Sequence, residues 1–415
     1  MHSPAITTDT PFLDSKYSWL RLFISVMISV VGSAGMWIVV VVIPSVQSEF
    51  GVDRSDATLP FTAVMVGFAI GNLVLGRLVD RFGIVVPMVM AAILLTLGFA
   101  LTSQASNIWS FAVYQGVFIG IGSAAAFGPL IADISHWFEK RRGIAVAAAA
   151  SGNYIAGAVW PFLLKDIIAA DGWRDAYLIA SLASLVIMLP MAFLLRRRIP
   201  AQTVDLGNTG STHLSGLKFI QLSPRSLQIL LGVAGVGCCV AMSMPQVHIV
   251  AYCADLGYGV AAGAGMLSIM LIGGIFSRLA SGMLADYIGG IRTILLGSFL
   301  QCMALFLYIP FDGLMSLYVV SLIFGLSQGG LVPGYALVVR EYLPAKEAGE
   351  RVGLVIMLTV VGMALGGWIS GWIYDLTGSY QAAFVNGIAW NMLNMLIMAF
   401  LLWRTKEPDA IPALQ

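Results

Sequence analysis

The segment GGIFSRLASGMLADYIGG, residues 273–290, decides how the rest of the chain is interpreted. It carries one arginine, Arg278, in a run that has no other charged residue from position 256 until Asp286. In a helix that rises about 1.5 Å per residue, Arg278 lies roughly 12 Å from that aspartate, close to the middle of a hydrocarbon layer about 30 Å thick. Insertion scales put the cost of an arginine there at about 2.5 to 3.5 kcal/mol, so we expect it to serve a substrate or ion site.

The composition of the chain indicates a membrane protein. Of its 415 residues, 59% are hydrophobic and only 10% are charged, whereas ordinary soluble domains have about 25% charged residues. A net charge of +1 gives no support to nucleic-acid binding, which needs a basic stripe. The four cysteines lack the spacing of a metal site, and we expect them to be small buried apolar groups. We therefore expect no metal and no cofactor.

Long intervals without charged residues mark the expected membrane spans. The longest interval, 82–132, is interrupted by a polar run at 103–107 and is interpreted as two spans. Apolar runs of about 20 residues cross a bilayer as helices, so the expected fold is an all-α membrane protein with twelve transmembrane helices. The intervals are 22–48, 57–76, 82–132, 143–164, 176–195, 226–254, 256–277, 293–311, 313–339, 352–374 and 376–403.

One long polar connection divides the spans into two groups of six. If both termini lie in the cytoplasm, all but four of the 22 lysines and arginines face the cytoplasm or its membrane surface, as the positive-inside rule requires. We expect a multi-pass protein of the bacterial inner membrane that works as a monomer in the lipid bilayer. The expected parts are a cytoplasmic N-terminal tail (1–18), an N-terminal six-helix bundle (19–195), a cytoplasmic central loop (196–225), a C-terminal six-helix bundle (226–403) and a cytoplasmic tail (404–415).

The two groups of six share an internal repeat. The residues Gly76, Asp80 and Gly83 recur 206 positions later as Gly282, Asp286 and Gly289. Two pseudo-symmetric six-helix bundles are a transporter architecture, in which the substrate site lies near the midplane at the interface of the repeats. The same shift places Asn72 of the first half at the position of Arg278, so we expect Asn72 to point at the same cavity.

The stretches GRLVDRFG (76–83) and GMLADYIG (282–289) resemble the loop signature of the major facilitator superfamily. Three more stretches, HWFEKRRGIAVAAAASGNYIAG (136–157), QVHIVAYCADLGYG (246–259) and SRLASG (277–282), are similar to its monocarboxylate-porter branch, which includes the oxalate/formate exchangers. The resemblance covers nearly the whole chain. In that family an arginine four residues before the loop glycine of the eighth helix binds the substrate carboxylate, and the resemblance implies this role for Arg278.

The chain departs from the family pattern at charged positions. Gly274 stands where members often carry an aspartate, one turn before the arginine. Residues 22–48 and 352–374 lack the lysines that some members carry in the first and eleventh helices. We therefore expect Arg278 to be the only fixed charge of the pocket, which favours a monoanion over a dianion.

We predict that Arg278 binds the carboxylate because a guanidinium offers five donors in a planar fork that matches it. The alternative is that Arg278 pairs with a distant acid such as Asp133, or with backbone carbonyls, and only shapes the bundle. Aromatic residues at a similar depth line the pocket, or else pack in the core or against lipid. The predicted substrate contacts besides Arg278 are Asn72, Tyr114, Phe127, Asn153, Tyr154, His248 and Tyr335.

Two residues are candidates for carrying a coupled proton. An unperturbed imidazole titrates near pH ~6.5, which suits His248, although a lone helix histidine is equally well explained as a structural group. Asp133 lies beside a basic cluster at the inner end of the fourth span, where desolvation raises the pKa of a carboxyl group. The alternative for Asp133 is a structural salt bridge.

Glycines and the repeated motif are expected to control movement. Gly67 with Gly71, and Gly116 with Gly120, are small-x-x-x-small pairs that allow close packing of helices. The motif aspartates are predicted to hold the outward-facing state by meeting helix N-termini and the arginines Arg81 and Arg351 at the cytoplasmic side. The predicted gating residues are Gly76, Asp80, Arg81, Gly83, Gly282, Asp286 and Gly289.

Together these features predict a secondary transporter of small monocarboxylates that works by alternating access, with a proton as the expected co-substrate. An exchanger of organic anions is the nearest alternative, and a drug or metabolite exporter is a weaker one. The sequence contains no His-Glu-x-x-His, Gly-x-Ser-x-Gly or P-loop motif, so we do not expect an enzyme. A membrane sensor would bind the acid without moving it.

Overall fold

The computed structural model describes residues 13–139, 141–197, 220–343 and 345–405. These residues are almost entirely helical, and twelve of their helical segments are long and apolar enough to cross a membrane. The predicted all-α fold with twelve spans is confirmed. Most of the predicted central loop and most of the two predicted tails lie outside the described residues.

The first six spans form one bundle. Span four combines four short helices and span six combines three, and both contain a π-helical segment, named η. Span one consists of α1 (Lys16–Gly32) and α2 (Ala34–Phe50), and spans two, three and five are the single helices α3 (Arg54–Phe82), α4 (Val85–Ser103) and α8 (Arg142–Ala170). Span four consists of α5 (Ile108–Tyr114), η1 (Gln115–Gly120), α6 (Ile121–Ala125) and α7 (Gly128–Ser135). Span six consists of α9 (Trp173–Ala183), η2 (Ser184–Met188) and α10 (Leu189–Leu194).

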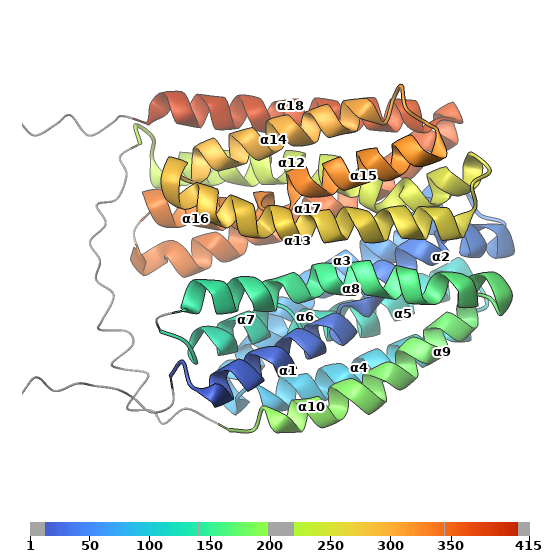
Figure 1. The fold of residues 1–415 in the computed structure, drawn as a ribbon, viewed down its shortest axis with the longest axis horizontal. Coiled ribbons are helices and arrows are strands. Elements are labelled where there is room, and N and C mark those ends of the chain that lie inside the picture. The colour runs from blue at the N-terminus through green and yellow to red at the C-terminus, as the bar shows by residue number, and fades with distance from the viewer. Residues whose placement is uncertain (1–12, 140, 198–219, 344, 406–415) are drawn as a thin grey trace, which may run out of the picture.

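The last six spans form the second bundle. Figure 1 shows it from yellow to red above the first bundle, which runs from blue to green. Spans seven, eight and nine are α12 (Pro224–Asp255), α13 (Val260–Ile288) and α14 (Gly290–Leu307). Span ten consists of α15 (Leu314–Gln328) and α16 (Leu331–Tyr342), and spans eleven and twelve are α17 (Ala345–Thr377) and α18 (Tyr380–Arg404).

The two ends of the molecule differ in what they carry. The helices α1 and α12 begin, and α10 and α18 end, at the left end of the molecule in Figure 1. We call this the basic end, because most of the described lysines and arginines lie there, and we call the other end the distal end. Two helix pairs form most of the seam between the halves, since α8 packs against α13 and α3 packs against α17, and α2 makes a smaller contact with α12.

The repeated motif is helical over most of its length. Gly76, Asp80 and Arg81 lie in α3, and Gly282 and Asp286 lie in α13. The stretches that resemble a loop signature are therefore mostly not loop, because a helix that has left the hydrocarbon layer continues through charged residues. Only Gly83 and Gly289 form the turn, with φ values of 78° and 83° that glycine adopts without steric penalty.

Small residues bring α3 and η1 into contact, which confirms the close packing predicted for Gly67 and Gly116. A side chain at Gly67 would overlap the carbonyl oxygen of Gly116 and lie 3.2 Å from the Cα atom of Gly120. These neighbours are backbone atoms, so they cannot move aside as a flexible side chain would. The contact between α3 and η1 within the N-terminal half therefore depends on the absence of a Cβ atom at this position.

We expect Gly67→Ala to lower the stability of the protein. Alanine gains about 1 kcal/mol over glycine in a helix interior, but overpacking against backbone costs about 1 to 3 kcal/mol, so the clash dominates. The matched control is Gly76→Ala on the same helix, where a Cβ atom would meet nothing within 4 Å. Unfolding midpoints in detergent should fall for the first variant and hold or rise for the second. Equal midpoints would contradict the packing argument.

Candidate functional site

Two spans are interrupted at matching places in the two halves. Span four breaks between α6 and α7, and span ten breaks between α15 and α16. A proline follows each break, Pro129 and Pro333, and proline has no N–H for the carbonyl four residues earlier. Broken helices in corresponding positions of repeated halves are typical of transporter binding sites. The region around the two breaks is therefore the candidate functional site.

Arg278 lies on α13 beside the break in span ten. Its Nε donates to the carbonyl oxygen of Gly329 (3.2 Å), and its Nη1 donates to the carbonyl oxygen of Ala150 on α8 (2.8 Å). Its Cζ lies 4.2 Å from the ring centroid of Tyr154, also on α8. Arg278 thus joins the two halves through uncharged partners. Of the roles left open by the sequence, contact with backbone carbonyls is the one seen in this conformation.

The break in span ten explains why a carbonyl is available to Arg278. Pro333 lies four residues after Gly329 and leaves that carbonyl without its helical donor. The N–H of the same residue donates to Ser277 Oγ at 3.1 Å. Two adjacent side chains of α13 therefore hold the peptide groups of Gly329, and a shift of Arg278 is coupled directly to the broken helix.

Asn153 extends this group of contacts to the first span. Its backbone and side-chain oxygens each lie 3.0 Å from Nε1 of Trp37, which donates to them. Trp37 is only 4% exposed. The predicted residues Asn153, Tyr154 and Arg278 are therefore neighbours in one polar path that runs from α2 through α8 to α13.

A cavity of about 1070 Å³ lies between the halves in the part next to the basic end. Its walls come from α3 and α7 on one side and from α12 and α17 on the other. Asn72 and Phe127, both predicted, line it, and the ring of Phe127 lies 6.0 Å from that of Phe68. The amide nitrogen of Asn72 donates to the carbonyl oxygen of Phe68 (2.8 Å), which fixes the side chain on the wall.

The charges of this cavity differ from the expectation. Among the described residues, its charged lining consists of Arg225 and Arg351, and Arg278 does not line it. The expectation that Arg278 is the only fixed charge of the pocket is therefore wrong for this cavity. The physical reason is the position of the cavity. The cavity extends toward the basic end, where the first turn of α12 and the start of the eleventh span carry arginines.

The distal end is closed by charged contacts between the halves. Arg54 on α3 places Nη2 at 2.9 and 3.1 Å from the two carboxylate oxygens of Asp255 on α12. Asp375 of α17 accepts hydrogen bonds from the backbone N–H groups of Arg54 (2.8 Å) and Ser55 (2.7 Å). A carboxylate from one half therefore caps the first turn of a helix from the other, which the helix dipole favours.

His248 is part of this closed end rather than of the cavity. Its Nε2 lies 2.8 Å from the carbonyl oxygen of Gly367, and its Nδ1 lies 3.0 Å from the hydroxyl oxygen of Tyr380. That hydroxyl oxygen accepts a hydrogen bond from Arg54 Nη1 at 2.8 Å. We name the group formed by Arg54, Asp255, Asp375, Tyr380 and His248 the distal gate.

We expect Asp255→Asn to favour opening of the distal gate. The substitution keeps the size of the side chain and removes one charge of the inter-half pair, whose carboxylate side chain is 31% exposed. Partial exposure limits the loss to about 1 to 2 kcal/mol, a population shift of roughly tenfold. Spin labels are placed at Asp171→Cys and Asp312→Cys, which are exposed positions of the two halves at the distal end. The distance distribution between the two labels should then show a larger fraction at the longer distance of the open gate.

The matched control for this experiment is Glu49→Gln. It breaks the pair between Glu49 and Arg174 (2.6 Å), which lies at the same end but within one half. We expect no change in the distance distribution for this variant. The four native cysteines are buried and do not compete for the label. An equal shift in both variants would show that the inter-half pair does not hold the gate.

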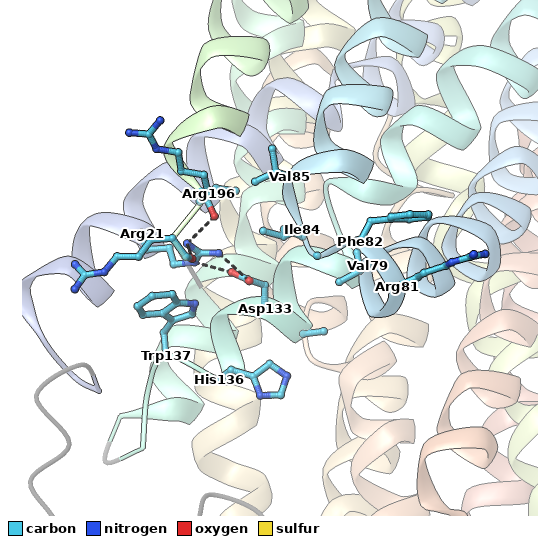
Figure 2. Close-up of a pocket in the computed structure, with 14 residues that line it drawn as sticks. Arg21, Val79, Arg81, Phe82, Ile84, Val85, Asp133, His136, Trp137 and Arg196 are labelled. Carbon is cyan, nitrogen blue, oxygen red and sulfur yellow. Dashed lines mark hydrogen bonds and ion pairs between the residues drawn. The ribbon is translucent and has the colours of Figure 1, made fainter. Parts of the chain in front are cut away.

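Asp133 has a partner that the sequence did not identify. Arg21 donates to its two carboxylate oxygens at 2.8 and 2.9 Å, and Arg21 is only 1% exposed. The guanidinium also donates to the carbonyl oxygen of Leu195 (3.0 Å) and lies over the ring of Trp137. Figure 2 shows this pair on the wall of a smaller pocket of about 300 Å³ near the basic end. Asp133 is thus engaged away from Arg278.

The remaining predicted residues lie outside the cavity. Tyr335 is fully buried within the C-terminal half, and its hydroxyl donates to Asn394 Oδ1 at 2.7 Å. Tyr114 lies at the end of α5 next to Phe118. Neither tyrosine lines the cavity, contrary to the expectation. For Tyr335 the reason is the break in span ten, which reorients the helix face that follows it. Asp286 is exposed and forms no ion pair within the described residues.

Several arginines that act between elements were not identified from the sequence. Arg21, Arg54 and Arg225 all stand within three residues of a charge-free interval, so they were interpreted as ordinary flanking charges, and Arg351 was predicted to meet the motif aspartates. Their partners lie 112 residues away for Arg21 and 201 for Arg54. A charged residue in the first turn of a long span, opposite an acid of another span, is the signal that identifies such pairs.

Comparison with known proteins agrees with this architecture. The sequence model described as Major Facilitator Superfamily matches residues 25–349 and 303–414. Monocarboxylate transporter 13 of Bos taurus is 29% identical over 325 residues, which cover 77% of this chain and 75% of the bovine protein.

Two solved structures share the fold. A bacterial homologue of the human lysosomal transporter Spinster, in an inward-facing and unoccupied conformation, has a TM-score of 0.68 at 13% identity and covers 95% of this chain and 99% of its own. The nucleoside transporter NupG has a TM-score of 0.72 at 11% identity, with 92% of this chain and 99% of its own covered. At such identities the likeness concerns the fold alone.

Proposed function

Because the chain belongs to the Major Facilitator Superfamily, and is therefore a multi-pass membrane transporter rather than an enzyme, we propose that it carries small organic monocarboxylates. One observation carries the proposal. Arg278 lies deep in a membrane span between the two halves, and the hydrogen-bond acceptors described for it are uncharged carbonyls. A half-buried guanidinium at this depth, with no acid paired to it among the described residues, favours an anionic ligand, and the similarity to bovine monocarboxylate transporter 13 supports a carboxylate as that anion.

In the proposed cycle the substrate carboxylate replaces the carbonyl oxygens of Ala150 and Gly329 on Arg278. The positive-inside rule puts the basic end in the cytoplasm, so the described conformation, with its cavity near that end and a closed distal gate, faces inward. Opening of the distal gate, together with closure at the basic end through the motif residues around Asp80 and Asp286, would give the outward-facing state.

We propose a proton as the co-transported ion. His248 is the favoured carrier, because Tyr380 links it to the gate residue Arg54. Asp133 is the weaker candidate, since Arg21 already holds both of its oxygens. An exchanger of organic anions is the alternative mode, and export of drugs or metabolites is a more distant one.

The proposal is tested by uptake into proteoliposomes. Labelled lactate and longer monocarboxylates should accumulate when the outside is more acidic, and a protonophore should abolish the accumulation. Uptake that is insensitive to the protonophore but requires an organic anion inside the proteoliposomes would show exchange instead. Binding of carboxylates without any movement would identify a sensor and contradict the proposal.

A further inference from the structure

The described lining of the cavity between the halves carries positive charge. Of its sixteen described lining residues, two are arginines, Arg225 and Arg351, and none is acidic. Gln228 accepts a hydrogen bond from Arg351 Nη1, and the carbonyl oxygen of Pro224 lies 3.5 Å from the same nitrogen. These contacts fix the guanidinium of Arg351 on the wall. A ligand of this cavity is therefore an anion whose charged group meets the arginines.

The rest of the wall is apolar and extends away from the arginines. Phe68, Phe127, Ile356, Met357 and Val360 line the cavity together with smaller apolar residues. Val360 follows Arg351 by nine residues on one helix, which separates them by roughly 14 Å along its axis. The charged part and the apolar part of the cavity are therefore arranged along its length, with the charge next to the basic end.

The size of the cavity adds a second constraint. Its volume of about 1070 Å³ lies at the upper end of the range of about 300 to 1000 Å³ that is typical of sites for drug-sized ligands. An acid of two or three carbon atoms would leave the aromatic and aliphatic wall in contact with water. Only a ligand with an apolar body gains from burying that wall.

We propose that the transported acids are amphipathic monocarboxylates, with one carboxylate and an aryl or medium-chain alkyl body. In the inward-facing state the carboxylate lies at Arg351 with Arg225 nearby, and the body lies against Phe68, Phe127 and Val360. This inference rests on the proposed carboxylate transport and adds its substrate class. It also assigns Arg351 as an anion-binding residue on the cytoplasmic side of Arg278.

The test measures binding to the full-length protein in nanodiscs, with empty nanodiscs to subtract partition into lipid. The probes are lactate, octanoate, phenylacetate and the uncharged phenylacetamide. Octanoate and phenylacetate should bind at least ten times more tightly than lactate, because each buried methylene improves affinity up to about fourfold. Phenylacetamide should bind at least ten times more weakly than phenylacetate, because it lacks the charge.

Two pairs of variants assign the contacts. Arg351→Gln should weaken the binding of phenylacetate about tenfold and leave the binding of phenylacetamide unchanged. Its control is Arg340→Gln, at an exposed arginine near the basic end that does not line the cavity, which should change the binding of neither compound. Val360→Thr should weaken the binding of phenylacetate several-fold and leave the binding of lactate unchanged. Its control is Val361→Thr, the next residue, which is 41% exposed on the outside of the bundle.

The outcomes separate this inference from the proposed function. If lactate is taken up through Arg278 while octanoate and phenylacetate neither bind nor compete, carboxylate transport stands and the amphipathic class is overturned. If phenylacetate binds equally well to Arg351→Gln, the assignment of Arg351 is overturned. If no carboxylate of any size binds or moves, the proposed function itself fails.

Discussion

Arg278→Lys is expected to lower carboxylate uptake into proteoliposomes about 100-fold, although the charge is conserved. Arg278 donates from two nitrogens that point to different helices, Nε to Gly329 and Nη1 to Ala150. A lysine ammonium is a single centre and cannot reproduce a planar fork. The loss of one charge-assisted hydrogen bond costs about 1.5 to 3 kcal/mol, which corresponds to roughly 10- to 150-fold in rate or affinity.

The control for this variant is Arg340→Lys, an exposed arginine near the basic end. It should transport like the unmodified protein. If the substrate binds at Arg278, the defect of Arg278→Lys should appear at subsaturating acid as a loss of kcat/KM, with normal folding by thermal unfolding. Unchanged transport by Arg278→Lys would show that the fork of donors is not used and would overturn the central step of the proposed cycle.

Arg21→Met is expected to cost about 3 to 5 kcal/mol of stability. The substitution leaves the Asp133 carboxylate, whose side chain is 15% exposed, without its partner, and breaking a buried ion pair from one side has this magnitude. Replacing both residues, Arg21→Met with Asp133→Leu, removes the unpaired charge and should recover most of the loss. Chemical unfolding of the two variants in detergent checks the difference.

The double variant also separates the two interpretations of Asp133. If the residue only forms a structural ion pair, uptake driven by a pH gradient should survive in the double variant, and this is the result we expect. Loss of proton-driven uptake in a protein that folds normally and still exchanges acid would identify Asp133 as a proton carrier. His248→Gln then serves as the comparison, because it alters the other candidate at the opposite end of the molecule.

The number of spans was predictable, but the ends of the helices were not. Charge is excluded from the hydrocarbon layer, so the charge-free intervals report each crossing directly. At the membrane surface this exclusion ends, and α3 continues through Arg77 and Arg81 to Phe82. The sequence for this reason indicates where a helix crosses the membrane and not where it stops.

The position of Arg278 was predictable, and backbone carbonyls were one of the partners considered, but the two residues that supply them were not predictable. Depth in a span follows from counting residues, whereas the partners are backbone carbonyls, which leave no trace in the side-chain pattern. Pro333, four residues after Gly329, was the one available sign of a released carbonyl. The misplacement of Tyr335 has a related cause, because its helix face follows a break that periodicity alone does not reveal.

The carbonyl partners of Arg278 have a kinetic consequence. A carrier must return empty after each delivery, and a bare guanidinium in the membrane would oppose that step. Hydrogen bonds from Arg278 to the carbonyl oxygens of Ala150 and Gly329 would lower that penalty during the return of the empty carrier. We therefore expect only weak trans-stimulation by acid on the opposite side, which is the behaviour of a net accumulator rather than of an obligatory exchanger.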